Sequence, residues 1–487
     1  MKKTITIAGV LLFSLLLISS SRSVAQKRVI PVLTDQQLVD GMSLGVQPSD
    51  TICIMAGRRG ELVLKNITGT ARDPVIIINR GGKVIIDTKK DYGILFNNSI
   101  HFRITGTGSG DAYGFEIASS ANHGLVVTEF SSYCEADHLE IHHVGFAGIV
   151  AKTDPNCTRK DLRYFIMQQL SFHDNLIHDT DAEGFYVGYS WHPAREYPCG
   201  KDSLLYSHEL HGVRIYNNTV YNSGQEGIQV GSGTKDVLIY SNSVFNYGMT
   251  NILWQNHGVQ IGQGTTGDFF NNKVSTGPAE ALSLFGGGNN RVYDNVIINS
   301  GVSAIYQNDR GAVAGSDYRI MNNTIISPGE NGVIAVSDHT EHNKFTGNTI
   351  VTSKPGNAFL SEGRMKWDSS GNRIYSSLEQ AGLDSGIVKR DTRKPVTSRF
   401  PFAADHSILL VEESGTVKDD YEFQTDLTDV SVRIYDGAGI LLRAGVTPLK
   451  EKEYKIVCSG WENGVYYISV SAGSKYRQLR RIVVKKD

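Results

Sequence analysis

The 487-residue sequence has only 12 prolines and no excess of basic residues, because 48 Lys and Arg face 50 Asp and Glu. A general nucleic-acid binder would be basic, so nucleic acid is not expected as a partner. Beyond the first 25 residues, no stretch approaches the roughly 18 to 20 consecutive apolar residues that a membrane-spanning helix requires. We therefore expect no transmembrane span, and a hydrophobic content of 40% is ordinary for a globular protein.

The first residues are the exception to this pattern. Lys2 and Lys3 precede an apolar core that runs through Ile18, and small residues lead up to Ala25. This order is typical of a secretory signal peptide, which we assign to residues 1–25. Without that segment 45 basic residues face 50 acidic ones, and the net charge moves from −2 to −5. The mature protein is therefore expected to be exported and acidic.

Cysteine is scarce, with five residues in the chain. An exported protein meets oxidising conditions, in which cysteines pair. Cys157 and Cys199 both lie in turn-rich segments that interrupt the pattern described below, so we predict a disulfide between them. Cys53 and Cys458 lie in apolar, strand-like runs and are expected to be buried thiols. Cys134 has no evident partner.

Glycine, by contrast, is abundant at 51 residues, and a repeated segment extends from about Leu170 to Leu360. Each repeat has an Asn, an aliphatic residue two positions later, a turn that usually contains Gly, and a short apolar strand. The aligned asparagines are Asn175, Asn218, Asn242, Asn272, Asn295, Asn323 and Asn348. A period mostly in the twenties without helical spacing is typical of a β-solenoid, whose coils stack to bury their aliphatic side chains. Asn at a fixed corner can pass amide hydrogen bonds from coil to coil.

Two of these repeats carry a family resemblance. RIYNNTVYNSGQEGIQVGSG (Arg214 to Gly233) and RIMNNTIISPGENGVIAV (Arg319 to Val336) resemble the right-handed parallel β-helix repeat of the pectate-lyase-like superfamily. The resemblance implies an all-β fold with a right-handed parallel β-helix, which we assign to residues 26–375. Thr34 to Met42 has an N-cap Thr and a short helical pattern, and we expect it to cap the first coil. That superfamily holds polysaccharide lyases, glycoside hydrolases, esterases and inert adhesins, so the fold does not fix the function.

The C-terminal region follows a polar segment at 376–399, which we interpret as a linker. Alternating strand patterns at 400–487 predict a small Ig-like β-sandwich. Val430 to Leu442, Glu462 to Tyr476 and the basic ending Arg480 to Lys486 resemble the type IX secretion C-terminal sorting domain of Bacteroidota. This resemblance implies the type IX secretion machinery as a partner and a location outside the cell, either secreted or on the outer-membrane surface.

The candidate catalytic residues come from one position of the repeat, just before its second Gly or Ala. Successive coils carry Glu183, Glu226, His257 and Glu280 there. Equivalent positions lie about 4.8 Å apart in stacked coils, so we predict a row of neighbouring carboxylates and imidazole. Such a row should raise carboxyl pKa values unless a cation lies among them. The alternative is an ordinary polar outer surface.

Glycoside hydrolysis is the first hypothesis for this row. Glu183 and Glu226, one coil apart, would lie near the roughly 5 Å of retaining enzymes, and Glu226 and Glu280 near the roughly 9.5 Å limit of inverting ones. The expected substrate is an extracellular polysaccharide, and the protein is expected to be a monomer. The predicted substrate-binding residues are acidic, amide, aromatic and basic side chains near the row. They are Asp179, Asp181, Tyr186, Trp191, Gln229, Trp254, Gln260, Tyr306 and Arg310.

Other functions stay open. A polysaccharide lyase would use His257 as its base and Arg195 or Arg310 to neutralise a uronate, and calcium held by Glu183, Glu226 and Asp181 would help an acidic cleft to bind it. No cofactor is otherwise required, and a transition-metal set of His257, Glu226 and His211 has no tight motif. The third alternative is a surface adhesin that binds glycans without catalysis.

Overall fold

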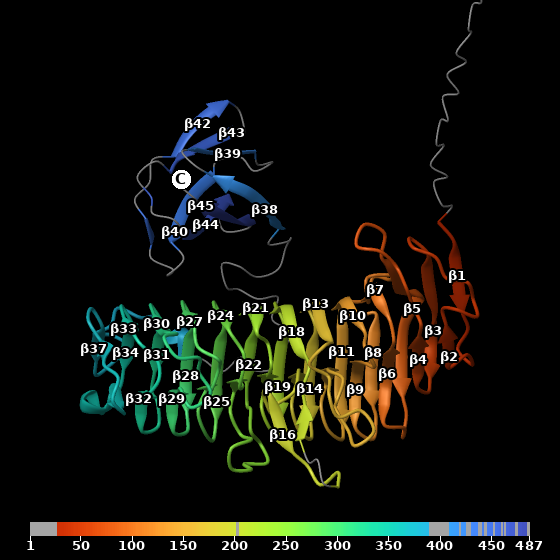
Figure 1. Cartoon of the computed structure of the whole chain (residues 1–487), viewed down its shortest axis with the longest axis horizontal. Coiled ribbons are helices and arrows are strands. Elements are labelled where there is room, and N and C mark those ends of the chain that lie inside the picture. The colour runs from red at the N-terminus through yellow and green to blue at the C-terminus, as the bar shows by residue number, and fades with distance from the viewer. Residues whose placement is uncertain are drawn as a thin grey trace, which may run out of the picture.

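The computed structural model describes residues 27–200 and 204–388, and in the C-terminal part residues 409–417, 420–424, 430–436, 441–442, 446–450, 453–458, 461, 464–472 and 476–484. The predicted signal peptide and residues 389–399 of the predicted linker lie outside them. From β1 to β37 the chain winds into a long right-handed coil of stacked parallel strands, as the repeat predicts (Figure 1). The all-β parallel β-helix is thus confirmed.

Three rows of strands form the three faces of the coil. The first row contains β7 (Ile100–Thr105), β10 (Ser132–Asp137), β13 (Ile166–His173), β18 (Glu209–Tyr216), β21 (Lys235–Tyr240), β24 (Gly267–Phe270), β27 (Asn290–Tyr293), β30 (Tyr318–Met321), β33 (Asn343–Thr346) and β36 (Trp367–Asp368). The second row contains β8 (Phe115–Ser119), β11 (Leu139–Val144), β14 (Leu176–Thr180), β19 (Thr219–Ser223), β22 (Ser243–Phe245), β25 (Lys273–Gly277), β28 (Val296–Ser300), β31 (Thr324–Ile326), β34 (Thr349–Val351) and β37 (Arg373–Tyr375). The third row contains β2 (Leu38–Asp40), β4 (Leu62–Lys65), β6 (Tyr92–Asn97), β9 (His123–Thr128), β12 (Ile149–Ala151), β15 (Phe185–Val187), β20 (Ile228–Val230), β23 (Val259–Ile261), β26 (Leu282–Leu284), β29 (Ser303–Asn308), β32 (Asn331–Val336) and β35 (Phe359–Glu362).

The first and second rows join into one 23-stranded sheet at the N-terminal end, where β1 (Val29–Val32), β3 (Thr51–Arg59) and β5 (Val75–Asp87) lie. β5 turns the corner without a break, since its first half pairs with β7 and its second half with β8. Gly81 and Gly82 lie at the bend with φ of 83° and 133°, values that a side chain would make costly.

The core is a continuous inner column of aliphatic side chains. One coil contributes Val213 and Ile215 from β18, Val220 from β19, and Ile228 and Val230 from β20, and all five are fully buried. A single coil could not bury these residues by itself, so each coil is stabilised by the coils above and below it.

The asparagine corner between the first and second rows is a hydrogen-bonded ladder. From Asn175 to Asn348, the backbone N–H and the side-chain Nδ2 of each Asn both donate to Oδ1 of the next, at 2.9 to 3.1 Å, and the ladder extends to Asn372. The residue before the Asn adopts a left-handed backbone, as at Asp174 and Asn217. Every buried amide of the corner thus finds a partner.

The predicted helix at Thr34 to Met42 is wrong. That segment forms β2 between two turns, and β2 pairs in parallel with β4. Strand pairing satisfies its backbone groups and buries Val39 in the core, which a single isolated turn of helix would not do. The described residues contain no α-helix, only the 3₁₀ turns η1 (Pro355–Asn357) and η2 (Ser385–Val388). None of their helices is long and apolar enough to cross a membrane.

Two excursions leave the coil and project from the same side of it (Figure 1). The first follows β15 and carries the hairpin β16 (Ala194–Glu196) and β17 (Leu204–Tyr206). Cys199 of this excursion forms a disulfide with Cys157, the pairing favoured by the sequence. The second excursion lies between β22 and β23.

The C-terminal part contains two sheets. β38 (Leu409–Val417), β45 (Tyr476–Val484), β44 (Gly464–Ala472), β40 (Val430–Asp436) and β41 (Leu441–Leu442) form a five-stranded sheet. β39 (Asp420–Gln424), β43 (Glu453–Val457) and β42 (Val446–Lys450) form a three-stranded sheet. Cys458 is buried there, as are Cys53 and Cys134 in the coil, and none of the three forms a disulfide within the described residues. The Ig-like class of this part stays a prediction.

Candidate active site

The predicted row of Glu183, Glu226, His257 and Glu280 lies in register along the third row of strands. Each residue stands two positions before a paired strand residue in β15, β20, β23 or β26. The four side chains therefore occupy equivalent positions on consecutive coils. The preceding coil has Ala147 there, which packs with Val126 and Val150 in a cluster separate from the main core. This places the row on the outer side of the coil.

The row is nevertheless buried. Glu226 is 0% exposed, Glu183 and His257 are 4% and 2% exposed, and only Glu280 is intermediate. The second excursion runs along the chain just before Glu226: the backbone N–H groups of residues 248–250 donate to carbonyls of residues 223–225. The row thus faces outward but is covered, and a polymer cannot reach it directly.

Burial changes the ionisation of the row. It raises the pKa of Glu226 to about 8, with the charge of Glu183 adding to the effect, and raises the pKa of Glu183 to about 7. Among the described residues neither carboxyl oxygen of Glu226 has a hydrogen-bond partner. Burial acts in the same direction on Glu280, but the imidazole of His257, 3.1 Å away, holds the pKa of that carboxyl below its usual range. At neutral pH Glu226 is therefore mostly protonated, and Glu183 is close to the midpoint of its titration.

The predicted substrate-binding residues fall into four places. Tyr186, Gln229, Gln260 and Tyr306 share one outer column of the third row. Part of this column is covered, because Tyr186 and Gln229 both hydrogen-bond Ser190 Oγ of the first excursion, at 2.8 and 2.6 Å.

Two tryptophans lie on the excursions, Trp191 at 49% and Trp254 at 62% exposure. The Arg310 guanidinium lies over the Phe285 ring. Asp179 and Asp181 lie elsewhere, in a groove at the corner between the second and third rows.

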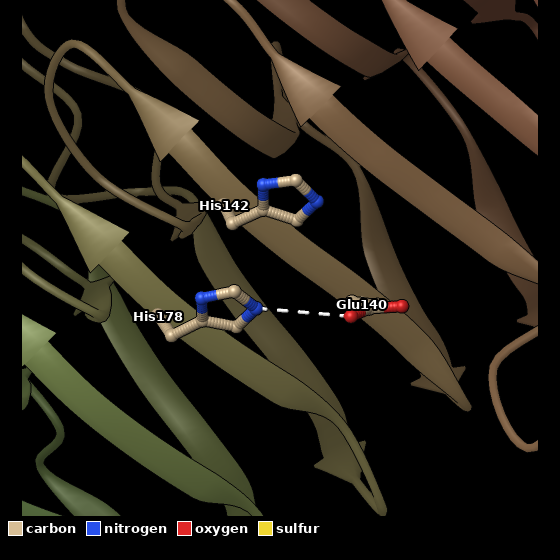
Figure 2. A group of neighbouring side chains, drawn as sticks. All are labelled: Glu140, His142 and His178. Carbon is tan, nitrogen blue, oxygen red and sulfur yellow. Dashed lines mark ion pairs between the residues drawn. The ribbon is translucent and has the colours of Figure 1, made fainter. Parts of the chain in front are cut away.

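A second group of titratable side chains gathers on the outer side of the second row, close to that groove. Lys83 Nζ from β5 contacts Oε2 of Glu116 at 2.7 Å and Oε2 of Glu140 at 2.9 Å. Nε2 of His142 lies 3.5 Å from Glu116 Oε1, and Nε2 of His178 lies 3.7 Å from Glu140 Oε1. Figure 2 shows Glu140, His142 and His178 on neighbouring strands. We call these five residues the histidine–carboxylate cluster.

The other nitrogen of each imidazole is also engaged. His178 Nδ1 lies 2.7 Å from Asp179 Oδ2, and His142 Nδ1 lies 2.6 Å from His143 Nδ1. The imidazoles of His142 and His178 stack with their centroids 4.9 Å apart, and His178 stacks in turn on Tyr221 with a centroid distance of 4.7 Å. Contacts on both sides of each ring fix its orientation. The side chains of Glu140, His142 and His178 stay 23%, 16% and 13% exposed, so solvent reaches them.

The cluster perturbs its own ionisation. His178, followed by Lys83, lowers the pKa of Glu140 to about 2 against the effect of burial. Burial opposes the charge of His178, but Glu140 and Asp179 raise its pKa. Burial and then the charge of His178 lower the pKa of His142. Several shifted groups in one accessible place are typical of a functional site.

The groove beside the cluster has a volume of about 670 Å³. His143, Asp179, Asp181 and Asn222 line it, with Thr250 of the second excursion. Asn222 Nδ2 donates to Asp179 Oδ1 at 2.8 Å. The groove therefore joins two predicted substrate-binding residues to the cluster, and not to the row.

Among the described residues, two groups bring three metal-ligating side chains within 4.8 Å of one another. They are Glu140, His142 and His178, and Glu135, Asp137 and His173. The calcium set considered from the sequence, with Glu183, Glu226 and Asp181, is not such a group. Neither is the set with His257, Glu226 and His211, since His211 lies on the first row beside Glu209.

The cluster was not among the sites predicted from the sequence. A signal was present, because Ile141-His142-His143 and Ile177-His178-Asp179 align in register on β11 and β14. The first of these, however, precedes the asparagine repeat.

Comparison with known proteins agrees with the two resemblances. Residues 204–376 match the family described as right handed beta helix region, and residues 416–485 match the secretion system C-terminal sorting domain. No curated protein sequence matches the chain.

Several solved structures are similar to the coil. An alginate lyase from Paenibacillus sp. str. FPU-7 is 16% identical, with 72% of this chain and 96% of that one covered at a TM-score of 0.33. A PL6-family polysaccharide lyase from Pseudopedobacter saltans is 12% identical, covering 75% and 97% at 0.33. The A-module of an Azotobacter vinelandii mannuronan C-5 epimerase is 14% identical, covering 69% and 91% at 0.33. Likeness this distant assigns no chemistry. From the family matches, residues 204–376 are a right-handed β-helix region and residues 416–485 a type IX secretion C-terminal sorting domain.

Proposed function

We propose that the protein is a polysaccharide-cleaving enzyme, acting as a monomer outside the cell, with its active centre at the histidine–carboxylate cluster. One observation carries the proposal: side chains from successive coils meet there, partly exposed, beside a groove of about 670 Å³. An accessible concave site with convergent titratable groups is the usual form of an active centre. Type IX secretion would bring the site to extracellular polymers, either free or at the outer-membrane surface.

β-Elimination from an acidic polysaccharide is the reaction that this site supports best. The reaction needs a cation at the uronate carboxylate, a base that takes the neighbouring proton, and an acid for the departing oxygen. The imidazoles of His142, His143 and His178 supply nitrogens for proton transfer, and Lys83, paired with Glu116 and Glu140, places a cation next to them. His143 lines the groove itself.

Hydrolysis by the buried row is the second candidate. The raised pKa values of Glu183 and Glu226 favour it, because a general acid must be protonated at neutral pH. The burial of both residues opposes it, since hydrolysis requires the two carboxyl groups to flank the glycosidic bond. We therefore rank β-elimination first.

The test is a panel of acidic and neutral polysaccharides incubated with the purified protein. A lyase produces both new reducing ends and the ultraviolet absorbance of unsaturated uronates, whereas a hydrolase produces reducing ends alone. An adhesin produces neither but still binds. Under the proposal His178→Gln lowers turnover at least ~100-fold and Glu226→Gln keeps most of it. The opposite pattern, or binding without any product, would overturn it.

A further inference from the structure

We infer that Glu140, His142 and His178 hold a divalent first-row transition metal of the zinc class, with Glu116 as a fourth ligand. This inference rests on the proposed function only for its role in the reaction, because the geometry stands by itself. The ligand atoms of Glu140, His142 and His178 all lie within 4.8 Å of one another (Figure 2). They come from the adjacent strands β11 and β14, so a rigid sheet fixes their spacing.

Two of the distances between ligand atoms are close to those of a tetrahedral centre. Bonds of about 2.0–2.2 Å from zinc to nitrogen and oxygen hold neighbouring ligand atoms about 3.3–3.6 Å apart. Nε2 of His142 and Oε1 of Glu116 are 3.5 Å apart, and Nε2 of His178 and Oε1 of Glu140 are 3.7 Å apart. Closing around one ion requires the two stacked imidazoles to tilt towards each other and Glu116 to turn inward, because Glu116 lies outside the group within 4.8 Å.

The surrounding residues hold the ligands in the orientation that a metal needs. His178 Nδ1 donates to Asp179 Oδ2 at 2.7 Å, which leaves the Nε2 lone pair on the side of Glu140. His142 Nδ1, 2.6 Å from His143 Nδ1, leaves its own Nε2 free when it donates to that neighbour. Such carboxylate–histidine pairs are the common support of zinc sites.

Lys83 binds the oxygens that the metal would not use. Its Nζ contacts Oε2 of Glu116 and Oε2 of Glu140, and the Oε1 atoms face the imidazoles. The carboxylates of Glu116, Glu140 and Asp179 outnumber the single charge of Lys83. A divalent cation bound by neutral histidines would bring the cluster to neutrality.

The ligand types select among metals. Two imidazole nitrogens with carboxylate oxygens suit zinc and its first-row neighbours, whereas calcium takes six to eight oxygens. The metal would lie beside the groove and could bind a uronate carboxylate there. His143 would then be the imidazole left for proton transfer, because His142 and His178 would be ligands.

The second group of potential ligands offers a matched control. His173 also stacks on a tyrosine, Tyr216, and its Nδ1 also lies 2.7 Å from an aspartate, Asp174. In that group, however, Arg103 Nε contacts Glu135 Oε1, the oxygen that faces His173 Nε2, at 3.0 Å, and Asp137 Oδ2 at 2.8 Å, whereas Lys83 contacts only the oxygens that face away from the imidazoles. We therefore expect no metal there, and a stoichiometry of one ion per chain.

The experiment is calorimetric titration of the chelator-treated full-length protein with ZnCl₂, CaCl₂ or MgCl₂, together with visible spectra after CoCl₂ addition. We expect one zinc ion to bind with a Kd of about 1 µM or tighter, a Tm rise of several degrees, and a cobalt spectrum of low coordination number. His142→Gln and His178→Gln should each weaken zinc binding at least ~100-fold, and Asp179→Asn ~10-fold or more. His173→Gln should leave it unchanged.

Each variant is first compared with wild type without metal, by circular dichroism and Tm, so that misfolding is not mistaken for ligand loss. If His178→Gln fails this comparison, Asp179→Asn carries the test. No zinc binding above that of the His142→Gln/His178→Gln double variant would overturn the inference. So would loss of binding in His173→Gln, or an equal preference for calcium. Binding of one zinc ion per chain without polysaccharide cleavage would overturn the proposed function and keep the metal site. Polysaccharide cleavage by a protein that binds no zinc would keep the proposed function and overturn the metal site.

Discussion

The outer sides of the second and third rows carry the same kinds of side chain but differ in what covers them. The third row has Glu183, Glu226, His257 and Glu280 in register, and this row is almost completely buried. The histidine–carboxylate cluster is less regular but partly exposed beside a groove. A position that faces away from a coil is therefore not the same as a position that solvent can reach. Excursions from the coil decide which of them stays accessible.

The largest expected difference is in activity, between two glutamates that each lie near a histidine. Glu140 Oε1 is 3.7 Å from His178 Nε2, and Glu280 Oε2 is 3.1 Å from His257 Nδ1. We expect Glu140→Gln to lower turnover on the best acidic polysaccharide at least ~100-fold, because it removes a group of the accessible site. Glu280→Gln should change it less than ~3-fold. A larger loss from Glu280→Gln would move the active centre back to the buried row.

The next prediction concerns stability and pH. Burial raises the pKa of Glu226 to about 8 from the ordinary 4.5, so the folded protein holds a proton that the unfolded chain releases earlier. The contribution of protonated Glu226 to the free energy of unfolding is therefore complete below the pKa of the unfolded chain and is lost as pH rises to about 8. Gln does not ionise, so Glu226→Gln avoids this loss of unfolding free energy, which is on the order of a few kcal/mol. Its Tm should exceed that of wild type at pH 8.5 and come close to it at pH 5.

The control for this measurement is Glu330→Gln, which changes an exposed carboxylate on a distant coil. Its Tm difference from wild type should stay the same at both pH values. If Glu226→Gln shows no alkaline gain either, then Glu226 is hydrated in solution and the contrast between buried and accessible rows fails.

The regular part of the molecule could be predicted from the sequence because it is periodic. Asn218 to Asn242 and Gln229 to Gln260 pair across neighbouring coils as the alignment predicts. Local pattern is enough where every coil repeats the same corner and the same inner aliphatic residues. The register of Glu226 and His257 follows from the same periodicity.

The asparagine repeat does not reveal most of the cluster, because Lys83, Glu116, Glu140 and His142 precede the first asparagine of the repeat and only His178 follows it. Glu116 and Glu140 come before Asn175, the first asparagine of the ladder. In the coil before it, Leu139 takes the place of the asparagine, and only its backbone N–H donates to Asn175 Oδ1. Lys83 reaches Glu116 and Glu140 across 33 and 57 residues of sequence. The burial of the row could not be predicted from the repeat either, because the excursions that cover it do not follow the repeat.

A smaller effect is expected from the disulfide that fastens the first excursion. Replacing Cys157 and Cys199 by Ser should lower the free energy of unfolding by about 2 kcal/mol, the low end of the usual range for a disulfide, since the bond joins two surface loops and the strands β13 to β15 between them stay paired without it. The excursion contacts Gln229 through Ser190, beside the row. Loosening it should therefore hydrate Glu226 and reduce the alkaline gain of Glu226→Gln in this background. If the Tm changes caused by the cysteine replacements and by Glu226→Gln add fully at pH 8.5, the first excursion does not shield Glu226 from water.

The smallest effect is expected at the exposed tip of the second excursion. Trp254 is 62% exposed, so Trp254→Ala should change the free energy of unfolding by no more than ~0.5 kcal/mol. If its ring stacks on sugar, affinity for the polysaccharide should fall several-fold, the size of one aromatic contact. Leu253→Ala is the matched control, since Leu253 is adjacent, 72% exposed and without a ring. Equal losses in binding assays of the two variants would mean that the excursion offers only apolar surface. A loss confined to Trp254→Ala would extend the substrate path from the groove, which Thr250 already lines, along the same excursion.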